Sequence, residues 1–153
     1  MRIFTLFTLY ILFFFTGCAG PKSLVPCSTL SKSGSTEYFA PGLMDHAKLD
    51  PSWLKTEIKK EELKEWLLTY VKKDNEDILT NNSFSKAELE KINMTMFDSY
   101  NNSWNQIEGK TSSEDKIYYY TTPQEYWASL AGQEGLVVIR NCKILYVIIL
   151  SQS

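Results

Sequence analysis

The chain has 153 residues, with 16 basic and 18 acidic side chains, one His and three Cys. This length suits one domain, and the net charge of -2 excludes a strongly basic nucleic-acid-binding protein and a polyacidic tail. With 44% hydrophobic and 22% charged residues, the composition is that of a globular protein rather than a disordered one.

The N-terminus has the pattern of an export signal. Arg2 gives a positive start, and Ile3 to Phe15 follow without a charge. This apolar segment is shorter than the roughly 20 residues that a membrane-spanning helix requires, but it has the length of a signal-peptide core. We therefore predict that residues 1–17 form a signal peptide, with an uncleaved membrane anchor as the alternative.

The segment Phe15-Thr16-Gly17-Cys18 resembles the lipobox of bacterial lipoproteins, in which small residues precede a Cys that is lipidated before cleavage. Phe15 departs from that pattern, where Leu is commoner. The resemblance implies a diacylglycerol group on Cys18 and an added acyl chain such as palmitate, which together anchor a protein stably. Ala19 stands where the inner-membrane sorting signal of such proteins has Asp, so the resemblance implies the outer membrane. Cleavage after Ala19, which would release a soluble secreted or periplasmic protein, is the alternative.

The remaining two cysteines are Cys27 and Cys142. Outside the cytoplasm of many bacteria the environment is oxidising, and two thiols allow only one connectivity. We predict one disulfide between them, with two unpaired thiols as the alternative. Residues 18–37, rich in Ser, Thr, Gly, Pro and Lys, are predicted to form a lipidated flexible tether. A single domain is predicted for residues 38–153.

Two amphipathic helices are predicted in the first half of this domain. Asp50-Pro51 is a helix-start signal, and the apolar residues up to Val71 recur at three or four positions, although the charged run at 59–62 interrupts them. Ser85 and Glu88 form a capping box before a second such pattern that reaches Ile107. Its Asn-rich second half favours fraying or a break.

The second half of the domain is predicted to be rich in strands. Ile117 to Thr121 has strand composition. Thr122 to Glu125 reads as a capping box with Pro123 at the first helical position, and Gly132 can close that short helix. Residues 136–140 and 143–150 are β-rich runs joined by Asn141-Cys142, which predicts a hairpin although a type I′ turn favours Gly at the second position. Together these elements predict an α+β fold, with two or three helices on a small antiparallel sheet that ends in a C-terminal hairpin.

The C-terminal segment is also faintly similar to the ends of small uncharacterised bacterial proteins, which carry no known activity. The matching residues are Pro123, Trp127, Leu130, Gly132, Gly135, Arg140 and Lys143. In those proteins the residue before the Lys is usually Gly, and Cys142 departs from that pattern.

No motif for catalysis, cofactor or metal binding is found in the sequence. His46 is the only histidine and lies in a segment with Pro and Gly, which is typical of a surface or packing residue. No nucleophile elbow or phosphate-binding loop is present. We therefore predict a lipid-anchored envelope protein without enzymatic activity, without cofactor or nucleic-acid partner, and with a binding or structural role. A small envelope hydrolase or inhibitor built around His46 is the alternative from another class.

Tyrosines are frequent, with nine in the chain. If Tyr118, Tyr119 and Tyr120 lie on a strand, Tyr119 points to the face opposite its two neighbours. Such rings can form an aromatic surface for a glycan or protein partner. Ordinary sheet packing, with the hydroxyls reaching solvent, is the simpler interpretation.

Overall fold

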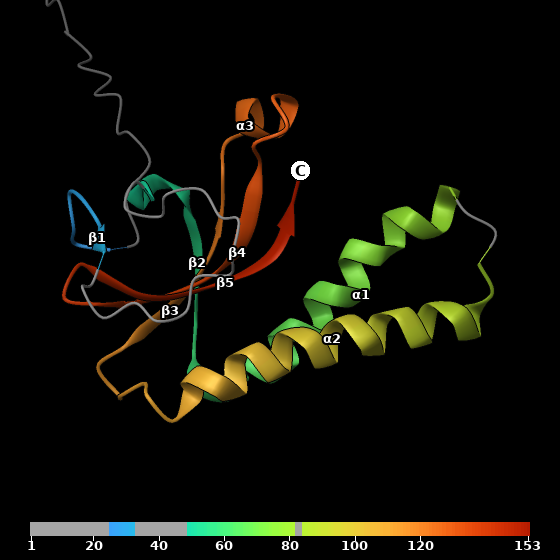
Figure 1. Ribbon diagram of the computed structural model, residues 1–153, viewed down its shortest axis with the longest axis horizontal. Helices are drawn as coiled ribbons and strands as arrows, with labels where there is room; N and C mark the ends of the chain where they lie inside the picture. The colour runs from blue at the N-terminus through green and yellow to red at the C-terminus, as the bar shows by residue number, and fades with distance from the viewer. Residues whose placement is uncertain (1–24, 33–48, 82–83) are drawn as a thin grey trace, which may run out of the picture.

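A five-stranded sheet with two long helices on one side organises the protein (Figure 1). The computed structural model describes residues 25–32, 49–81 and 84–153. The strands are β1 (Ser31–Lys32), β2 (Leu54–Ile58), β3 (Lys116–Thr121), β4 (Gln133–Arg140) and β5 (Lys143–Gln152). The helices are α1 (Leu63–Asn81), α2 (Lys86–Glu108) and α3 (Gln124–Ala128), with 3-10 turns at Pro51–Trp53 and Lys60–Glu62.

The strands lie in the order β1-β5-β4-β3-β2. β2 to β5 are antiparallel, and β1 is added at the β5 edge as a parallel strand with Ser31 opposite Lys143. The predicted α+β fold with a C-terminal hairpin is therefore confirmed. Ser85 caps α2 as predicted, and α2 is continuous through its Asn-rich second half because Trp104 and Ile107 there are buried in the core.

Both faces of the sheet are covered by apolar side chains. The helix-side core fills the space between the sheet and the two long helices, and the opposite core lies beneath the N-terminal segment. Buried residues of the helix-side core are Ile58, Leu63, Leu67, Val71, Phe97, Trp104, Ile107, Ile117, Leu136, Val138, Ile148 and Leu150. Buried residues of the opposite core are Val25, Leu30, Leu49, Leu54, Tyr118, Tyr120, Val137, Ile139, Ile144 and Val147.

The hairpin between β4 and β5 has the predicted two-residue turn. Asn141 and Cys142 both have positive φ, 49° and 61°, as a type I′ turn requires. The ladder carries register shifts, and at one of them a Cβ on Gly135 would lie 2.2 Å from the backbone oxygen of Ile148. β4 and β5 contribute side chains to the cores on both faces of the sheet, and this explains their long apolar runs.

The first predicted helix is wrong over residues 51–62, which is more than half of its predicted length. Asp50 accepts a hydrogen bond from the Ser52 amide at 2.8 Å, but the turn that it caps ends at Trp53 and β2 follows. The helix begins only at Leu63. Leu54 and Ile58 are four residues apart, which fits a helix, but a register shift in β2 lets them enter opposite cores on a strand.

The predicted tether over residues 18–37 is wrong for its described part. Val25 and Leu30 are buried in the opposite core, and Ser31–Lys32 pairs with β5. These residues therefore belong to the domain, whose N-terminal boundary lies before 38. The segment was predicted to be flexible from its average composition, which is rich in Ser and Pro. Its few apolar side chains nevertheless bind it to the domain, because they are buried against the sheet.

The predicted capping box at α3 is also wrong. Thr122 is buried and its hydroxyl accepts a hydrogen bond from the Gln133 amide at 3.0 Å, so it extends the ladder between β3 and β4. Pro123 precedes the helix, and Ser129 ends it. Gly132 is not the cap, and a Cβ there would lie 2.2 Å from the Trp127 ring. The close approach of that ring explains the glycine.

Within the residues that the structure describes, no helix combines the length and the apolar character needed to cross a membrane.

Candidate functional site

The predicted site residues divide into those that the structure places and those that it does not describe. Cys18 and His46 lie outside the described residues, as does the predicted signal peptide. Cys27 and Cys142 are joined by a disulfide, with their Cα atoms 5.7 Å apart. The bridge connects the N-terminal segment to the turn of the β4–β5 hairpin.

The three consecutive tyrosines alternate between the two sheet faces, as predicted. Tyr118 and Tyr120 belong to the opposite core, whereas Tyr119 packs against the helix-side core. Burial and the neighbouring Glu57 carboxylate raise the pKa of Tyr118 to about 12. Tyr118 and Tyr120 are thus packing residues, and Tyr119 is the one that joins a cluster of rings beside α1.

That aromatic cluster comprises Trp66, Tyr70, Tyr100 and Tyr119. Trp66 and Tyr70 are one helical turn apart on α1 and stack with their ring centroids 5.4 Å apart and their planes at 14°. Tyr119 of β3 lies 5.3 Å from the Trp66 ring and 6.1 Å from the Tyr70 ring. Tyr100 of α2 lies 6.5 Å from Tyr70. These separations are those of aromatic pairs in contact, so the cluster is a packed unit rather than a loose set of rings.

Two hydroxyls of the aromatic cluster hold one carboxylate. Tyr70 donates to Oε1 of Glu134 at 2.6 Å, and Tyr119 donates to Oε2. Burial, the hydrogen bond and the nearby negative charge raise the pKa of both tyrosines above that of free tyrosine. The hydroxyls therefore remain protonated donors at neutral pH. Glu134 lies in β4 and is fixed in place by α1 and β3 together.

A cleft of about 450 Å³ lies between α1 and the sheet, and we call it the aromatic cleft. It is lined by Glu134 and by all rings of the aromatic cluster except Tyr100. Its volume is within the range of about 300–1,000 Å³ that is typical of small-ligand sites. Its lining combines rings, hydroxyls, two carboxylates and one ammonium group: Thr56, Trp66, Thr69, Tyr70, Lys73, Asp74, Tyr119 and Glu134.

The aromatic cleft offers groups that are suited to molecular recognition. Flat rings offer apolar contact area, and Glu134 and Asp74 offer hydrogen-bond acceptors beside them. Its described lining contains no His or Cys that could act as nucleophile or base. Among the described residues, no three His, Cys, Asp or Glu side chains gather as metal ligands.

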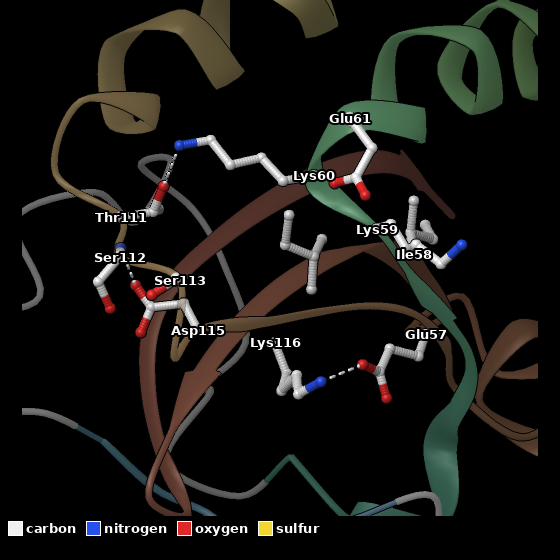
Figure 2. Close-up of a pocket in the computed structure, with 11 residues that line it drawn as sticks. Glu57, Ile58, Lys59, Lys60, Glu61, Thr111, Ser112, Ser113, Asp115 and Lys116 are labelled. Atoms are coloured by element: carbon white, nitrogen blue, oxygen red, sulfur yellow. Dashed lines mark hydrogen bonds and ion pairs between the residues drawn. The ribbon is translucent and has the colours of Figure 1, made fainter.

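A second, more polar crevice of about 420 Å³ lies where β2, the turn before α1 and the loop after α2 meet (Figure 2). Two of its lysines make contacts across the crevice. Lys116 Nζ is 2.7 Å from Oε1 of Glu57, and Lys60 Nζ donates to Thr111 Oγ1 at 3.1 Å (Figure 2). Lys60 Nζ also donates to the Glu108 carbonyl at 3.2 Å. The polar contacts in this crevice therefore hold neighbouring structural elements together.

The sequence indicated only part of the aromatic cleft. Tyr119 was expected to stand apart from its neighbours, but Trp66 and Tyr70 have helical spacing that is equally typical of core packing. Glu134 carries no local signal, because its role depends on two hydroxyls from distant segments. No family model, no curated protein and no solved structure matches the chain.

Proposed function

We propose that the protein is a lipid-anchored bacterial envelope protein that binds glycan chains in the aromatic cleft without catalysing a reaction. The observation that carries the binding role is the aromatic cleft itself, where Trp66, Tyr70 and Tyr119 lie beside an oriented carboxylate. Sugar rings present apolar C–H faces and a rim of hydroxyls, so they require flat aromatic surfaces next to hydrogen-bonding groups.

A non-enzymatic role is supported by the hydrogen bonds of Glu134. Both of its carboxyl oxygens accept a hydrogen bond from a tyrosine. A glycosidase needs a protonated carboxylic acid that donates to the leaving oxygen. The geometry at Glu134 is that of an acceptor, which suits binding.

The anchor is supported by the lipobox resemblance at Cys18, and the fold limits the distance between lipid and body. Because the described domain already begins at Val25, only seven chain steps separate it from Cys18. At about 3.6 Å per residue these steps span at most roughly 25 Å. An anchored protein would therefore work close to the membrane surface rather than at the end of a long tether.

Membrane fractionation and intact mass of the wild type and of Cys18→Ser test the anchor. We expect the wild type in the membrane fraction with a lipid-sized mass added to the residue at 18, and the variant without that mass and released from the membrane. A wild-type protein that is soluble and begins at Gly20 would contradict the anchor.

Calorimetric titration with a hexamer of N-acetylglucosamine tests the glycan role. We expect binding by the wild type and about tenfold weaker binding by Trp66→Leu, since a stacked aromatic pair is lost. Trp53→Leu is the matched control, because Trp53 packs on Tyr126 at 5.4 Å outside the aromatic cleft. Equal loss in both variants would show that the effect is structural and would contradict the role of this cleft.

A further inference from the structure

We infer that the glycan bound in the aromatic cleft carries free amino groups, so that a protonated amine of the sugar pairs with Glu134. This inference rests on the proposed glycan-binding function and names the class of sugar. It begins from the charge of the cleft, whose described lining carries the carboxylates of Glu134 and Asp74 and one ammonium group, that of Lys73.

The position of Glu134 is the first argument. Its carboxylate lies at the hydroxyl edges of the Tyr70 and Tyr119 rings. Each carboxylate oxygen accepts one hydrogen bond from a tyrosine hydroxyl. An ionised carboxylate has about four acceptor positions, so further donors can still bind to it. A sugar ring lying on these rings would place a substituent, rather than its own face, beside the carboxylate.

The surroundings of the carboxylate are the second argument. Glu134 is half-buried and lies next to rings that exclude water, so an opposite charge is attracted more strongly there than at an open surface. The faces of aromatic rings are also attractive to cations. Lys73 is exposed on α1, whereas Glu134 is half-buried in β4.

The same features disfavour other sugars. A carboxylated or sulfated sugar would place a second negative charge beside Glu134 and would be repelled. An N-acetylated amine is neutral and offers one N–H donor in place of three ammonium protons. The cleft should therefore distinguish the free amine from its acetylated form.

Two hexasaccharides that differ only in acetylation provide the test. Calorimetric titration at mildly acidic pH compares the glucosamine hexamer, whose amines are protonated, with the N-acetylglucosamine hexamer. We expect the glucosamine hexamer to bind about tenfold tighter, the size of one charge-assisted hydrogen bond. Added salt should reduce this preference, because screening weakens charge pairing.

Glu134→Gln should bring the two affinities to within about twofold of each other, because the variant keeps the shape of the side chain and removes its charge. Glu90→Gln makes the same charge change on an exposed part of α2 and should leave the preference intact. If Glu134→Gln fails to fold, a wild-type preference that added salt does not reduce would still overturn the charge pairing.

The outcomes separate this inference from the proposal beneath it. Equal affinity of the wild type for both hexamers, or a preference that survives Glu134→Gln, would overturn the amine inference and leave glycan binding in place. If the wild type binds neither of the two hexamers, glycan binding in the aromatic cleft is overturned as well.

Discussion

At the scale of single residues, one partly buried ion pair connects the loop after α2 to the end of β4. The Asp115 side chain is 1% exposed, and its two oxygens face the Arg140 guanidinium, with Nη2 at 2.8 Å from Oδ2. The Ser112 amide donates to the same oxygen at 2.7 Å. Burial by itself would raise the pKa of Asp115, but the bonds from Arg140 and Ser112 outweigh it and hold this pKa below its usual value.

The Asp115–Arg140 pair makes stability depend on pH in a defined direction. Because the folded pKa of Asp115 is depressed, its contribution is present above the unfolded value of about 3.9 and is lost as the pH falls through the folded value. We expect Asp115→Asn to lower the free energy of unfolding by about 1–3 kcal/mol at neutral pH, since charged hydrogen bonds are lost. Urea unfolding from pH 7 downwards measures this difference, which should shrink below about pH 4.

Glu90→Gln is the control for this series, because it removes a carboxylate from an exposed position on α2. Its difference from the wild type should be small at every pH. A gap for Asp115→Asn that stays constant down to the lowest pH would show that the charge of Asp115 does not carry the effect.

At the scale of elements, local signals identified those segments whose conformation is fixed by near neighbours. Ser85 and Glu88 cap each other reciprocally, and the sequence shows both halves of that arrangement. The hairpin was equally visible, because two β-rich runs flank two residues. In contrast, β2 was mistaken for helix, since only its pairing with β3 decides how Leu54 and Ile58 are used.

The hairpin turn departs from the best local sequence at a single position. Cys142 has a φ of 61°, in the left-handed region where a side chain is strained and glycine is not. The disulfide to Cys27 explains why a cysteine stands there. Local turn chemistry and a long-range link thus compete for the same residue.

Cys142→Gly and Cys27→Ser separate these two effects. Both remove the disulfide, which closes a sequence separation of 115 residues and is worth about 4–5 kcal/mol on loop-entropy grounds. Only Cys142→Gly also relieves the turn, so we expect it to be about 1 kcal/mol more stable than Cys27→Ser. Urea unfolding under identical oxidising conditions compares them. Equal stability of the two variants would contradict strain at the turn.

At the scale of the whole molecule, the sheet is covered by two unlike layers. The helix side is covered by α1 and α2, which are long and continuous, whereas the opposite core is covered in part by the short segment 25–32 (Figure 1). The sequence predicted the helical layer, because amphipathic periodicity is a local property. It did not predict the other layer, because Val25 and Leu30 are isolated apolar residues among polar ones. Only the folded structure shows that they are buried in the opposite core.

The aromatic cleft lies on the helix side, and the disulfide lies at the hairpin turn, where it connects to the segment that covers the opposite core. The two layers should therefore respond separately when the disulfide is removed. Only two residues of β1 pair with β5, and the Ser31 amide bonds to the Cys142 carbonyl at 3.1 Å. Without the covalent link, this short pairing is the weakest part of the sheet.

We expect Cys27→Ser to lose hydrogen-exchange protection at Ser31 and to become sensitive to proteases within residues 25–32, because a two-residue strand cannot hold its partner alone. Amides of α1 next to the aromatic cleft, around Trp66 and Tyr70, should keep their wild-type ranking, since their packing does not involve the bridge. Exchange followed by mass spectrometry on native protein measures both regions at once. A uniform loss of protection across both layers would instead mean that the bridge stabilises the molecule only globally, through the entropy of the unfolded chain. Local loss in one layer would establish that the cleft is supported by the helices and the sheet, independently of the N-terminal segment.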